Sequence, residues 1–475
     1  MSTAHTLKKG SLGLLSIVFF VIAAASPLTG VVGGLPIAFF VGNGAGVPGV
    51  YLLAGILLIL FSFGFVSMSR YVVNSGAFYA YITQGLGVGL GLSGLNLALL
   101  GYTCMQLAVS SMFGFFTEQL VQSFHVNLPI TWWMYAILMQ VVVVFLGIAK
   151  VEIGGRVLGL LMACEVGIVL LLDGYIVLQQ PSFEFSSFAP STFLSGNFGI
   201  SMVFAICSFI GFEATAIYSE ECRNAKVTIP RATFIAVTLI TVFFAFSSWA
   251  FVQLMGVNNI AQIAAADPNL FVFNIAQQLL GGWSLQLISI LLVTSLFAAS
   301  QAFHNSLSRY LYTMGRDQLI WTKVAKTHAK HQTPYMASIV QGIFMVAMLV
   351  LFAVAQLDPM IDVFAWASVL GSMTVLTLQV GVSVAAIQFF RRNPQLPVSL
   401  WSRLIAPLLA TLGMIYVLIN VVQNLQVLSG STSSVIFLLP CLIVICVLTG
   451  LLTAHYLKNK NPQRYMMLAK MIEII

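Results

Sequence analysis

Twelve long apolar segments run through this chain and constrain its fold more than any other feature. An α-helix of about 20 apolar residues is long enough to cross the hydrocarbon core of a bilayer. The segments lie at roughly 12–40, 48–69, 87–117, 131–149, 155–179, 197–221, 231–256, 284–314, 335–355, 362–390, 403–424 and 434–457. Because the connections are short, the sequence predicts an all-α integral membrane protein with twelve transmembrane helices and no sizeable soluble domain.

The scarcity of charge excludes several other classes of protein. Only 7% of the 475 residues are charged and 59% are hydrophobic, whereas a soluble domain carries about 25% charged residues. Such a chain cannot cover a water-facing surface, so it is not a soluble enzyme, a nucleic-acid binder or a disordered protein. The net charge of +7 therefore needs another explanation.

The positions of the basic residues supply that explanation. With a cytoplasmic N-terminus, the predicted helices put all 20 Lys and Arg residues on the cytoplasmic side. These are Lys8, Lys9, Arg70, Lys150, Arg156, Arg223, Lys226, Arg231, Arg309, Arg316, Lys323, Lys326, Lys330, Arg391, Arg392, Arg403, Lys458, Lys460, Arg464 and Lys470. By the positive-inside rule, both termini are predicted to lie in the cytoplasm and the protein in the cytoplasmic membrane.

The loops predicted to lie outside carry only acidic residues. These are Glu118, Asp173, Glu184, Asp267, Asp358 and Asp362. We expect no disulfide, because the six cysteines lie inside the predicted helices or, for Cys222, at a cytoplasmic helix end. We also expect no cofactor and no metal site.

The first apolar segment contains a helix break. It reads Ala-Ser-Pro-Leu-Thr-Gly-Val-Val-Gly-Gly from Ala25 to Gly34. Pro27 lacks a backbone donor and the glycines favour non-helical dihedrals. One interpretation is an unwound site whose free N–H groups bind an anionic ligand group, and the other is a simple proline kink.

The sixth segment contains a second break. Gly211 lies between two bulky aromatics, Phe209 and Phe212, and Glu213 follows in the apolar middle of the segment. Interrupted helices at corresponding positions of two halves are typical of inverted-repeat transporters with a site at the bilayer midplane.

This correspondence predicts the domain organisation. The chain divides into a cytoplasmic tail (1–11), a first five-helix repeat (12–196), a second five-helix inverted repeat (197–390), helices eleven and twelve (391–457) and a cytoplasmic tail (458–475).

Two carboxylates, Glu165 and Glu213, fall at bilayer depth in this prediction. A carboxylate there costs several kcal/mol unless it is protonated, paired or hydrated, so both residues are candidates for proton coupling. The alternative is a permanently protonated Glu that hydrogen-bonds neighbouring backbone. Tyr102 could face the site through its hydroxyl or pack within the bundle, and Phe303 is a candidate inner gate.

Several motifs resemble those of the amino acid–polyamine–organocation permeases. They are Gly211-Phe212-Glu213, Ser219-Glu220-Glu221-Cys222-Arg223-Asn224, Thr228-Ile229-Pro230-Arg231-Ala232, Asn74-Ser75-Gly76-Ala77-Phe78-Tyr79 and Gly315-Arg316-Asp317. The resemblance covers roughly residues 10–400 and is specific for the superfamily but not for the substrate. It implies twelve helices, a five-plus-five inverted repeat and alternating access around broken helices one and six.

The resemblance also assigns roles to residues. A substrate carboxylate would meet the backbone of the first break, which carries over to Ala25, Ser26, Leu28, Thr29 and Gly30. An aromatic lid falls on Phe209 or Phe212, the floor of the site on Gly211, and cytoplasmic gating pairs on Glu220, Glu221 and Arg223.

Two departures from the family pattern bear on the substrate and on coupling. The first break reads Ser-Pro-Leu-Thr-Gly from Ser26 to Gly30, where amino acid exchangers commonly have Gly-Ser-Gly-Ile-Phe. Glu165 stands where some proton-coupled members have a Lys.

The leading functional hypothesis is a proton-coupled symporter that imports an amino acid. Its partners would be the small-molecule substrate, protons and the lipid bilayer, and the protein would be a monomer or a homodimer. Alternatives are an importer of a polyamine or other small amine, a substrate–product exchanger and, with less support, a channel or a non-transporting sensor. A membrane enzyme is disfavoured because the chain contains neither His-Glu-x-x-His nor Gly-x-Ser-x-Gly.

Overall fold

The computed structural model describes residues 10, 12–74, 76–125, 128–149, 151–430 and 434–470, with the backbone alone at 151–158, 434, 435 and 470. Some sequence predictions lie outside the described part. They concern the N-terminal tail except Gly10, which includes Lys8 and Lys9. They also concern Ser75, Lys150 and the side chains of Arg156 and Lys470.

The described chain is helical because an α-helix satisfies its own backbone hydrogen bonds where no water is available. The α-helices are α1 (Leu14–Ala25), α2 (Pro27–Thr29), α3 (Leu35–Ile37), α4 (Val47–Ser69), α5 (Phe78–Leu86), α6 (Val88–Ser123), α7 (Trp132–Ile148), α8 (Val151–Leu178), α9 (Pro190–Phe193), α10 (Phe198–Cys207), α11 (Ala214–Ile217), α12 (Ala225–Met255), α13 (Ile260–Ala266), α14 (Phe271–Leu280), α15 (Gly282–Arg316), α16 (Tyr335–Val354), α17 (Ala365–Arg392), α18 (Ala406–Gln423), α19 (Leu425–Ser429), α20 (Leu439–Lys460) and α21 (Pro462–Lys470).

Shorter π-helical and 3₁₀ stretches extend or connect these helices. The π-helical stretches are Gly30–Gly34, Ala38–Asn43, Pro359–Phe364 and Trp401–Ile405. The 3₁₀ stretches are Gly44–Gly46, Ser186–Phe188, Ser219–Glu221, Thr322–Ala325 and Ser434–Leu438. Extended pairing within the described residues amounts to one parallel bridge between Leu12 and Cys222.

Nine helices among the described residues are long and apolar enough to cross a membrane. They are Leu14–Ser69, Val88–Ser123, Gly159–Leu178, Ala225–Met255, Gly282–Arg316, Tyr335–Val354, Pro359–Arg392, Trp401–Gln423 and Ile436–Lys460. The first of these covers the first two predicted segments, and the shorter apolar helices α7 and α10 coincide with the fourth and sixth. An all-helical multi-pass membrane protein is therefore confirmed, whereas the count of twelve crossings stays a prediction.

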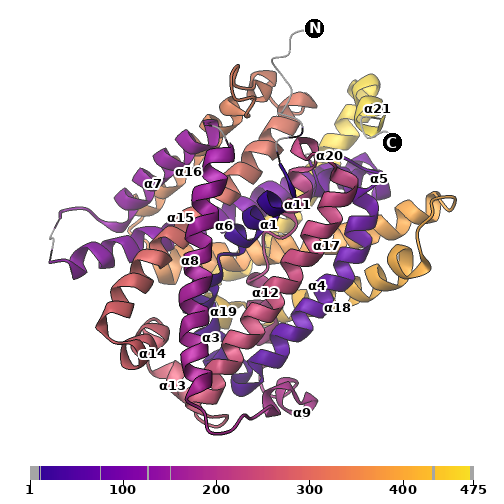
Figure 1. Cartoon of the computed structure of the whole chain (residues 1–475). Helices are drawn as coiled ribbons and strands as arrows, with labels where there is room; N and C mark the ends of the chain where they lie inside the picture. The colour runs from indigo at the N-terminus through magenta and orange to yellow at the C-terminus, as the bar shows by residue number, and fades with distance from the viewer. Residues whose placement is uncertain are drawn as a thin grey trace.

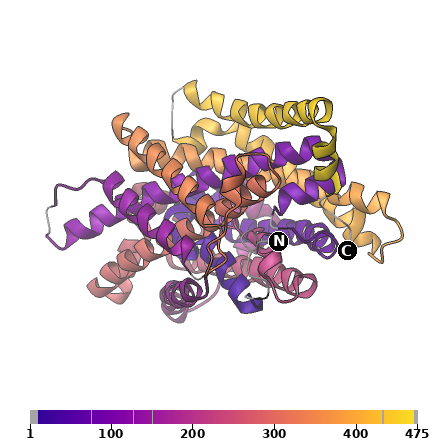
Figure 2. The same ribbon diagram turned by 90° about the horizontal axis from the view of Figure 1, so that it is seen from above.

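Both described ends of the chain lie at one end of the bundle, which we call the terminal side (Figure 1). Helices α9, α13 and α14 lie at the other end, which we call the opposite side. Helix α12 packs between α4 and α8, and α6 packs against α15, α17 and α20. Figure 2 shows α20 at one outer edge of the molecule.

Small residues allow the helices to approach closely. A Cβ atom on Gly85 of α5 would lie 2.2 Å from the carbonyl oxygen of Ala385 in α17. A Cβ on Gly55 of α4 would lie 2.1 Å from the Thr241 hydroxyl oxygen in α12. Neither position can hold a larger side chain unless its neighbour moves.

The outer surface is apolar, as expected of helices in contact with lipid. Phe145 is 70% exposed and Leu160 is 68% exposed. In contrast, Asp173 is fully buried inside α8, where its side chain accepts a hydrogen bond. Its prediction as a loop residue was wrong, because α8 extends to Leu178 and Asp173 faces another helix rather than water.

Candidate functional site

The first helix break is centred on Ser26. Helix α1 ends at Ala25, Ser26 adopts the left-handed conformation with φ of 48°, and Pro27 begins α2. This conformation is costly for a residue with a Cβ atom. It is held in place because the Ser26 hydroxyl donates to Thr29 Oγ1 at 2.7 Å and contacts Ser295 Oγ of α15 at 2.7 Å.

The second break lies between α10 and α11. Gly211 has φ of 111°, which an L side chain rarely adopts. A Cβ atom on Gly211 would lie 2.6 Å from Cβ of Ala24, the next-to-last residue of α1. The two breaks therefore touch each other, and glycine is required at this contact for both its dihedral angles and its size.

Glu213 closes the second break against α6. Its Oε1 accepts a hydrogen bond from the Tyr102 hydroxyl at 2.8 Å, and its Oε2 accepts one from the backbone N–H of Gly211 at 3.1 Å. The carboxylate is 1% exposed, so the fold brings two predicted site residues, Tyr102 and Glu213, into one buried pair.

Glu165 lies near the first break. Ser295 is a hydrogen-bonding partner of the Glu165 carboxylate, and the Ser295 hydroxyl contacts Ser26. Glu165 is 2% exposed, and its Oε1 atom has no hydrogen-bond partner among the described residues. The two predicted intramembrane carboxylates thus occupy different environments, one fully hydrogen-bonded and the other only in part.

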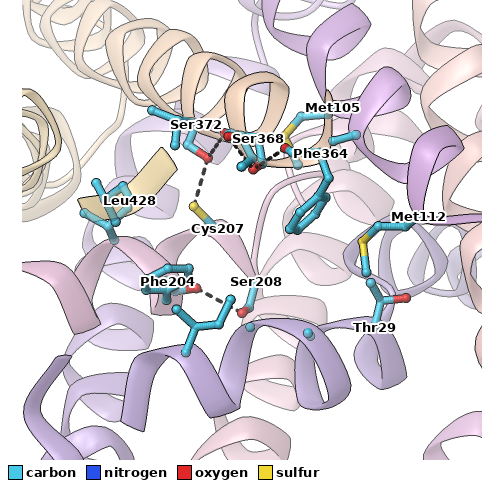
Figure 3. Close-up of a pocket in the computed structure, with 18 of the residues that line it drawn as sticks. Thr29, Met105, Met112, Phe204, Cys207, Ser208, Phe364, Ser368, Ser372 and Leu428 are labelled. Carbon is cyan, nitrogen blue, oxygen red and sulfur yellow. Dashed lines mark hydrogen bonds between the residues drawn. The ribbon is translucent and has the colours of Figure 1, made fainter. Parts of the chain in front are cut away.

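A cavity of about 480 Å³ lies between the first break, α6, α10 and α17. Its described lining contains no Asp, Glu, Lys, Arg or His side chain. Figure 3 shows Thr29, Met105, Met112, Phe204, Cys207, Ser208, Phe364, Ser368, Ser372 and Leu428 around this space. The site is an apolar cavity with a few hydroxyl groups and one thiol, of a size suited to a small organic molecule.

Some predicted site residues line this cavity and others do not. Those that line it are Ala25, Ser26, Thr29, Gly30 and Phe303. Those outside its lining are Leu28, Tyr102, Phe209, Gly211, Phe212, Glu165 and Glu213. The two residues predicted as alternative aromatic lids are fully buried in the core, and the aromatic side chains at the cavity are instead those of Phe40, Phe204, Phe303 and Phe364.

Helices α6 and α17 contribute lining residues that the sequence reading missed. On α17 these are Ser368 and Ser372, which follow at intervals of four from Phe364, the last residue of the π-helical stretch before α17. On α6 they are Met105 and Met112. Residues at such intervals share one helix face. The pattern was visible in the sequence, but nothing in the sequence indicated which face of either helix meets the cavity.

An aromatic layer beside the cavity consists of Phe303 and Tyr310 of α15 and Tyr102 of α6. The Tyr102 ring lies 6.1 Å from the Phe303 ring and 5.8 Å from the Tyr310 ring, measured between centroids. The Arg309 guanidinium lies 4.6 Å from the centroid of the Tyr218 ring. Arg309 also belongs to one of the two ion pairs described next.

Two ion pairs join the loop after α11 to α15. Arg309 Nε and Nη2 donate to the two carboxylate oxygens of Glu221 at 2.6 and 3.1 Å. Arg316 Nη1 donates to both oxygens of Glu220 at 3.1 Å. The predicted gating carboxylates are thus paired, but with arginines of α15 rather than with Arg223.

Arg223 has a different position from the one expected. Its Nε donates to the carbonyl oxygen of Gly10, and its backbone N–H donates to that of Leu12. Arg223 therefore ties the N-terminal segment to the terminal side of the bundle.

Asp317 lies next to Arg316 of the second ion pair. Burial raises the pKa of Asp317 above its usual range, and the positive charge of Arg316 opposes this effect.

Comparison with known proteins identifies the family. The family model described as "Amino acid permease" matches residues 12–450. The chain is 24% identical over 324 residues to the branched-chain amino acid permease BcaP of Bacillus subtilis, which covers 68% of this chain and 60% of that protein. It is 25% identical over 307 residues to the Asc-type amino acid transporter 1 of Homo sapiens, which covers 61% and 56%.

A third relative is named for a different substrate. The chain is 22% identical over 357 residues to the low-affinity putrescine importer PlaP of Escherichia coli, which covers 72% of this chain and 75% of that protein. The alignments span less than two thirds of the length of the first two relatives. The family is one of permeases, in agreement with the prediction that the chain is not an enzyme. Because the family match extends over nearly the whole sequence, the chain belongs to the amino acid permease family.

Proposed function

We propose that this protein is a secondary active transporter that imports a neutral, apolar amino acid together with a proton by alternating access. The observation that carries the proposal is the contact between two helix breaks beside a cavity of about 480 Å³. Broken helices of two repeats that meet at a central cavity are the usual site of such transporters.

The proposed orientation follows from the charges. Basic residues end several helices, such as Arg391 and Arg392 on α17 and Lys458 and Lys460 on α20. With these ends in the cytoplasm and twelve crossings, the terminal side is cytoplasmic. The ion pairs Glu221–Arg309 and Glu220–Arg316 then close the cytoplasmic side, while the cavity borders residues nearer the outer side, such as Asn269 and Met360.

The chemistry of the cavity supports a neutral apolar substrate. A diamine or lysine carries a second ammonium group, which would need a carboxylate partner in a dry site. The described lining offers none. Met105, Met112 and Phe364 offer apolar surface for an amino acid side chain, and the first break at Ser26, Thr29 and Gly30 is available to its carboxylate.

The two intramembrane carboxylates support different parts in proton coupling. Both oxygens of Glu213 accept hydrogen bonds, as expected of a group that holds the second break in shape. Glu165 has one oxygen without a partner among the described residues and contacts the hydroxyl cluster of the first break through Ser295. We therefore assign proton binding to Glu165 and a positioning role to Glu213.

The test is uptake of radiolabelled leucine by the full-length protein in proteoliposomes. An inward proton gradient should drive accumulation into liposomes that contain no substrate, and a protonophore should abolish it. Uptake only after preloading would identify an exchanger instead. Uptake of putrescine or lysine without leucine would contradict the proposed substrate class, and liposomes without protein are the control.

A further inference from the structure

Asp173 is a third carboxylate at membrane depth, and the proposed mechanism does not yet use it. It lies on the buried face of α8, a stripe that also contains Met162, Glu165, Val169, Leu172 and Ile176. Residues three and four positions apart share one helix face, so Glu165 and Asp173 both point into the protein. Asp173 is 0% exposed.

The Asp173 carboxylate is only partly satisfied. Its Oδ2 accepts a hydrogen bond from the Ser247 hydroxyl of α12 at 2.6 Å. Its Oδ1 is buried and has no hydrogen-bond partner among the described residues. An ionised carboxylate in this position would be buried with a single donor, which is strongly unfavourable.

No cation is available to neutralise Asp173 from the helices that pack against α8. Helices α1, α2 and α14 contain no ionisable side chain. On α12 the ionisable residues are Lys226 and Arg231, and Arg231 is about 24 Å from Ser247 along the helix at 1.5 Å per residue.

Other ionisable groups lie on further helices that pack against α8 or on the opposite side, and none is a described hydrogen-bond partner of Asp173. On α15 and α7 they are His304, Arg309, Tyr310, Tyr312, Arg316 and Tyr135, and on the opposite side the nearby carboxylates are Glu184 and Asp267. The α15 residues all follow Ser295, which contacts Glu165, and so lie toward the terminal side.

The ligand that suits this site is a proton rather than a metal ion. Calcium and magnesium require about six or more oxygen ligands. The contacts of Asp173 supply one carboxylate and one hydroxyl, and no group of three or more His, Cys, Asp or Glu side chains that could hold a metal occurs in the described part of the chain.

The site is separate from Glu165. Eight residues along α8 correspond to about 12 Å, and the side chains of Ile168, Val169 and Leu172 fill the buried face between the two carboxylates. Asp173 lies five residues from the end of α8 at Leu178, or about 7.5 Å. Water can therefore reach Asp173 from the opposite side only if α8 and α12 separate there.

We propose that Asp173 is a second proton-binding site, which binds a proton while α8 and α12 are packed together and releases it to water when their ends on the opposite side separate. This inference rests on the proposed transport function. Ser247 is one helical turn from Phe244, whose ring lies 2.5 Å from the Cβ position of Gly30 in the first break. Movement of α12 at Ser247 would thus reach the substrate cavity through Phe244.

The test compares Asp173→Asn with the wild-type protein in proteoliposomes. The neutral amide mimics the protonated acid but has no proton to release. Gradient-driven leucine accumulation should fall by at least about tenfold, whereas leucine exchange at equal pH should stay within about twofold. Asp267→Asn, which changes a half-buried carboxylate on the same side, should leave both activities unchanged. Equal accumulation by Asp173→Asn and wild type, or loss of exchange together with accumulation, would overturn the proposal.

Two further measurements extend the test, and the second of them needs no transport assay. Ser247→Ala removes the one donor to the carboxylate, so the pH midpoint of uptake should move up by about one unit; an unchanged midpoint contradicts the proposal. Hydrogen–deuterium exchange, corrected for intrinsic rates, should increase with pH at the ends of α8 and α12 in wild type but not in Asp173→Asn. This readout needs no transport, so its outcome is distinguishable from failure of the proposed function.

Discussion

The two helix breaks occupy corresponding positions in the two predicted repeats but differ in chemistry. The first is opened by Pro27, exposes Ser26 and Thr29 to the cavity and leaves one oxygen of the neighbouring Glu165 without a partner among the described residues. The second is opened by Gly211, and its own carboxylate, Glu213, is hydrogen-bonded on both oxygens and lies outside the cavity lining. A polar residue at a helix break can therefore contribute to the ligand site or stabilise the break itself.

The strongest test of this comparison is the contact between the breaks. Gly211→Val should cost about 3–5 kcal/mol, because the added side chain meets Ala24 and the backbone is in a conformation unfavourable for a β-branched residue. Folded yield and thermal stability in detergent measure this effect. Gly167→Val is the control, since a Cβ at Gly167 meets nothing within 4 Å. Equal stability of both variants would contradict the contact.

The next test separates the two carboxylates. Glu165→Gln should reduce proton-driven leucine accumulation by at least about tenfold and retain exchange. Glu213→Gln should retain accumulation but lower stability by about 1–3 kcal/mol, because an amide nitrogen cannot accept from the Gly211 N–H. Parallel uptake and thermal-shift measurements give both values, with Glu184→Gln as an exposed control. A reversal of the two results would exchange the assigned roles.

A smaller effect should come from the thiol that lies between the second break and the cavity. Cys207 lines the cavity and lies 2.9 Å from Ser372 Oγ. A small methanethiosulfonate reagent added from outside should block leucine uptake, and leucine should slow the reaction about fivefold by occupying the cavity. Cys207→Ser should be insensitive to the reagent. Full inhibition of Cys207→Ser would show that another cysteine is responsible.

The smallest effect is expected from loss of the Tyr102 hydroxyl, which donates a hydrogen bond to Glu213 at the second break. Tyr102→Phe removes one hydrogen bond to Glu213 and should lower stability by about 1–2 kcal/mol, with proton-driven uptake retained. Tyr175→Phe, on the exposed face of α8, should have no effect in the same thermal-shift measurement. Loss of proton-driven uptake in Tyr102→Phe at normal stability would assign Tyr102 to transport instead.

Local features of the sequence predicted the positions of both breaks but not their surroundings. Pro27 and Gly211 act on their own backbone, so their effect can be read without knowledge of the fold. The lid assignment depended on which face of the second break meets the cavity. The structure buries Phe209 and Phe212 and presents Phe204 instead, because the chain turns through Gly211 before α11 begins.

Asp173 shows a second limit of the sequence. The predicted segment 155–179 contained Asp173, but the residue is acidic and near the outer end of the segment, so it was assigned to the loop. In the structure α8 continues past Asp173, and the Ser247 hydroxyl of α12 donates a hydrogen bond to the Asp173 carboxylate. The partners of Glu220 and Glu221 were missed for a similar reason, since Arg309 and Arg316 are about 90 positions away in the chain.

That this chain is a helical membrane protein of the permease class with two broken helices follows from its sequence alone. Those properties depend on composition, on residues such as Pro27 and on local motifs, and the surrounding lipid leaves the backbone no alternative to helix. In contrast, the residues that line the cavity, and the hydrogen bonding of Glu165, Asp173 and Glu213, depend on how the helices pack together. Side-chain partners across helices depend on how each helix is rotated in the bundle, which packing against all its neighbours determines.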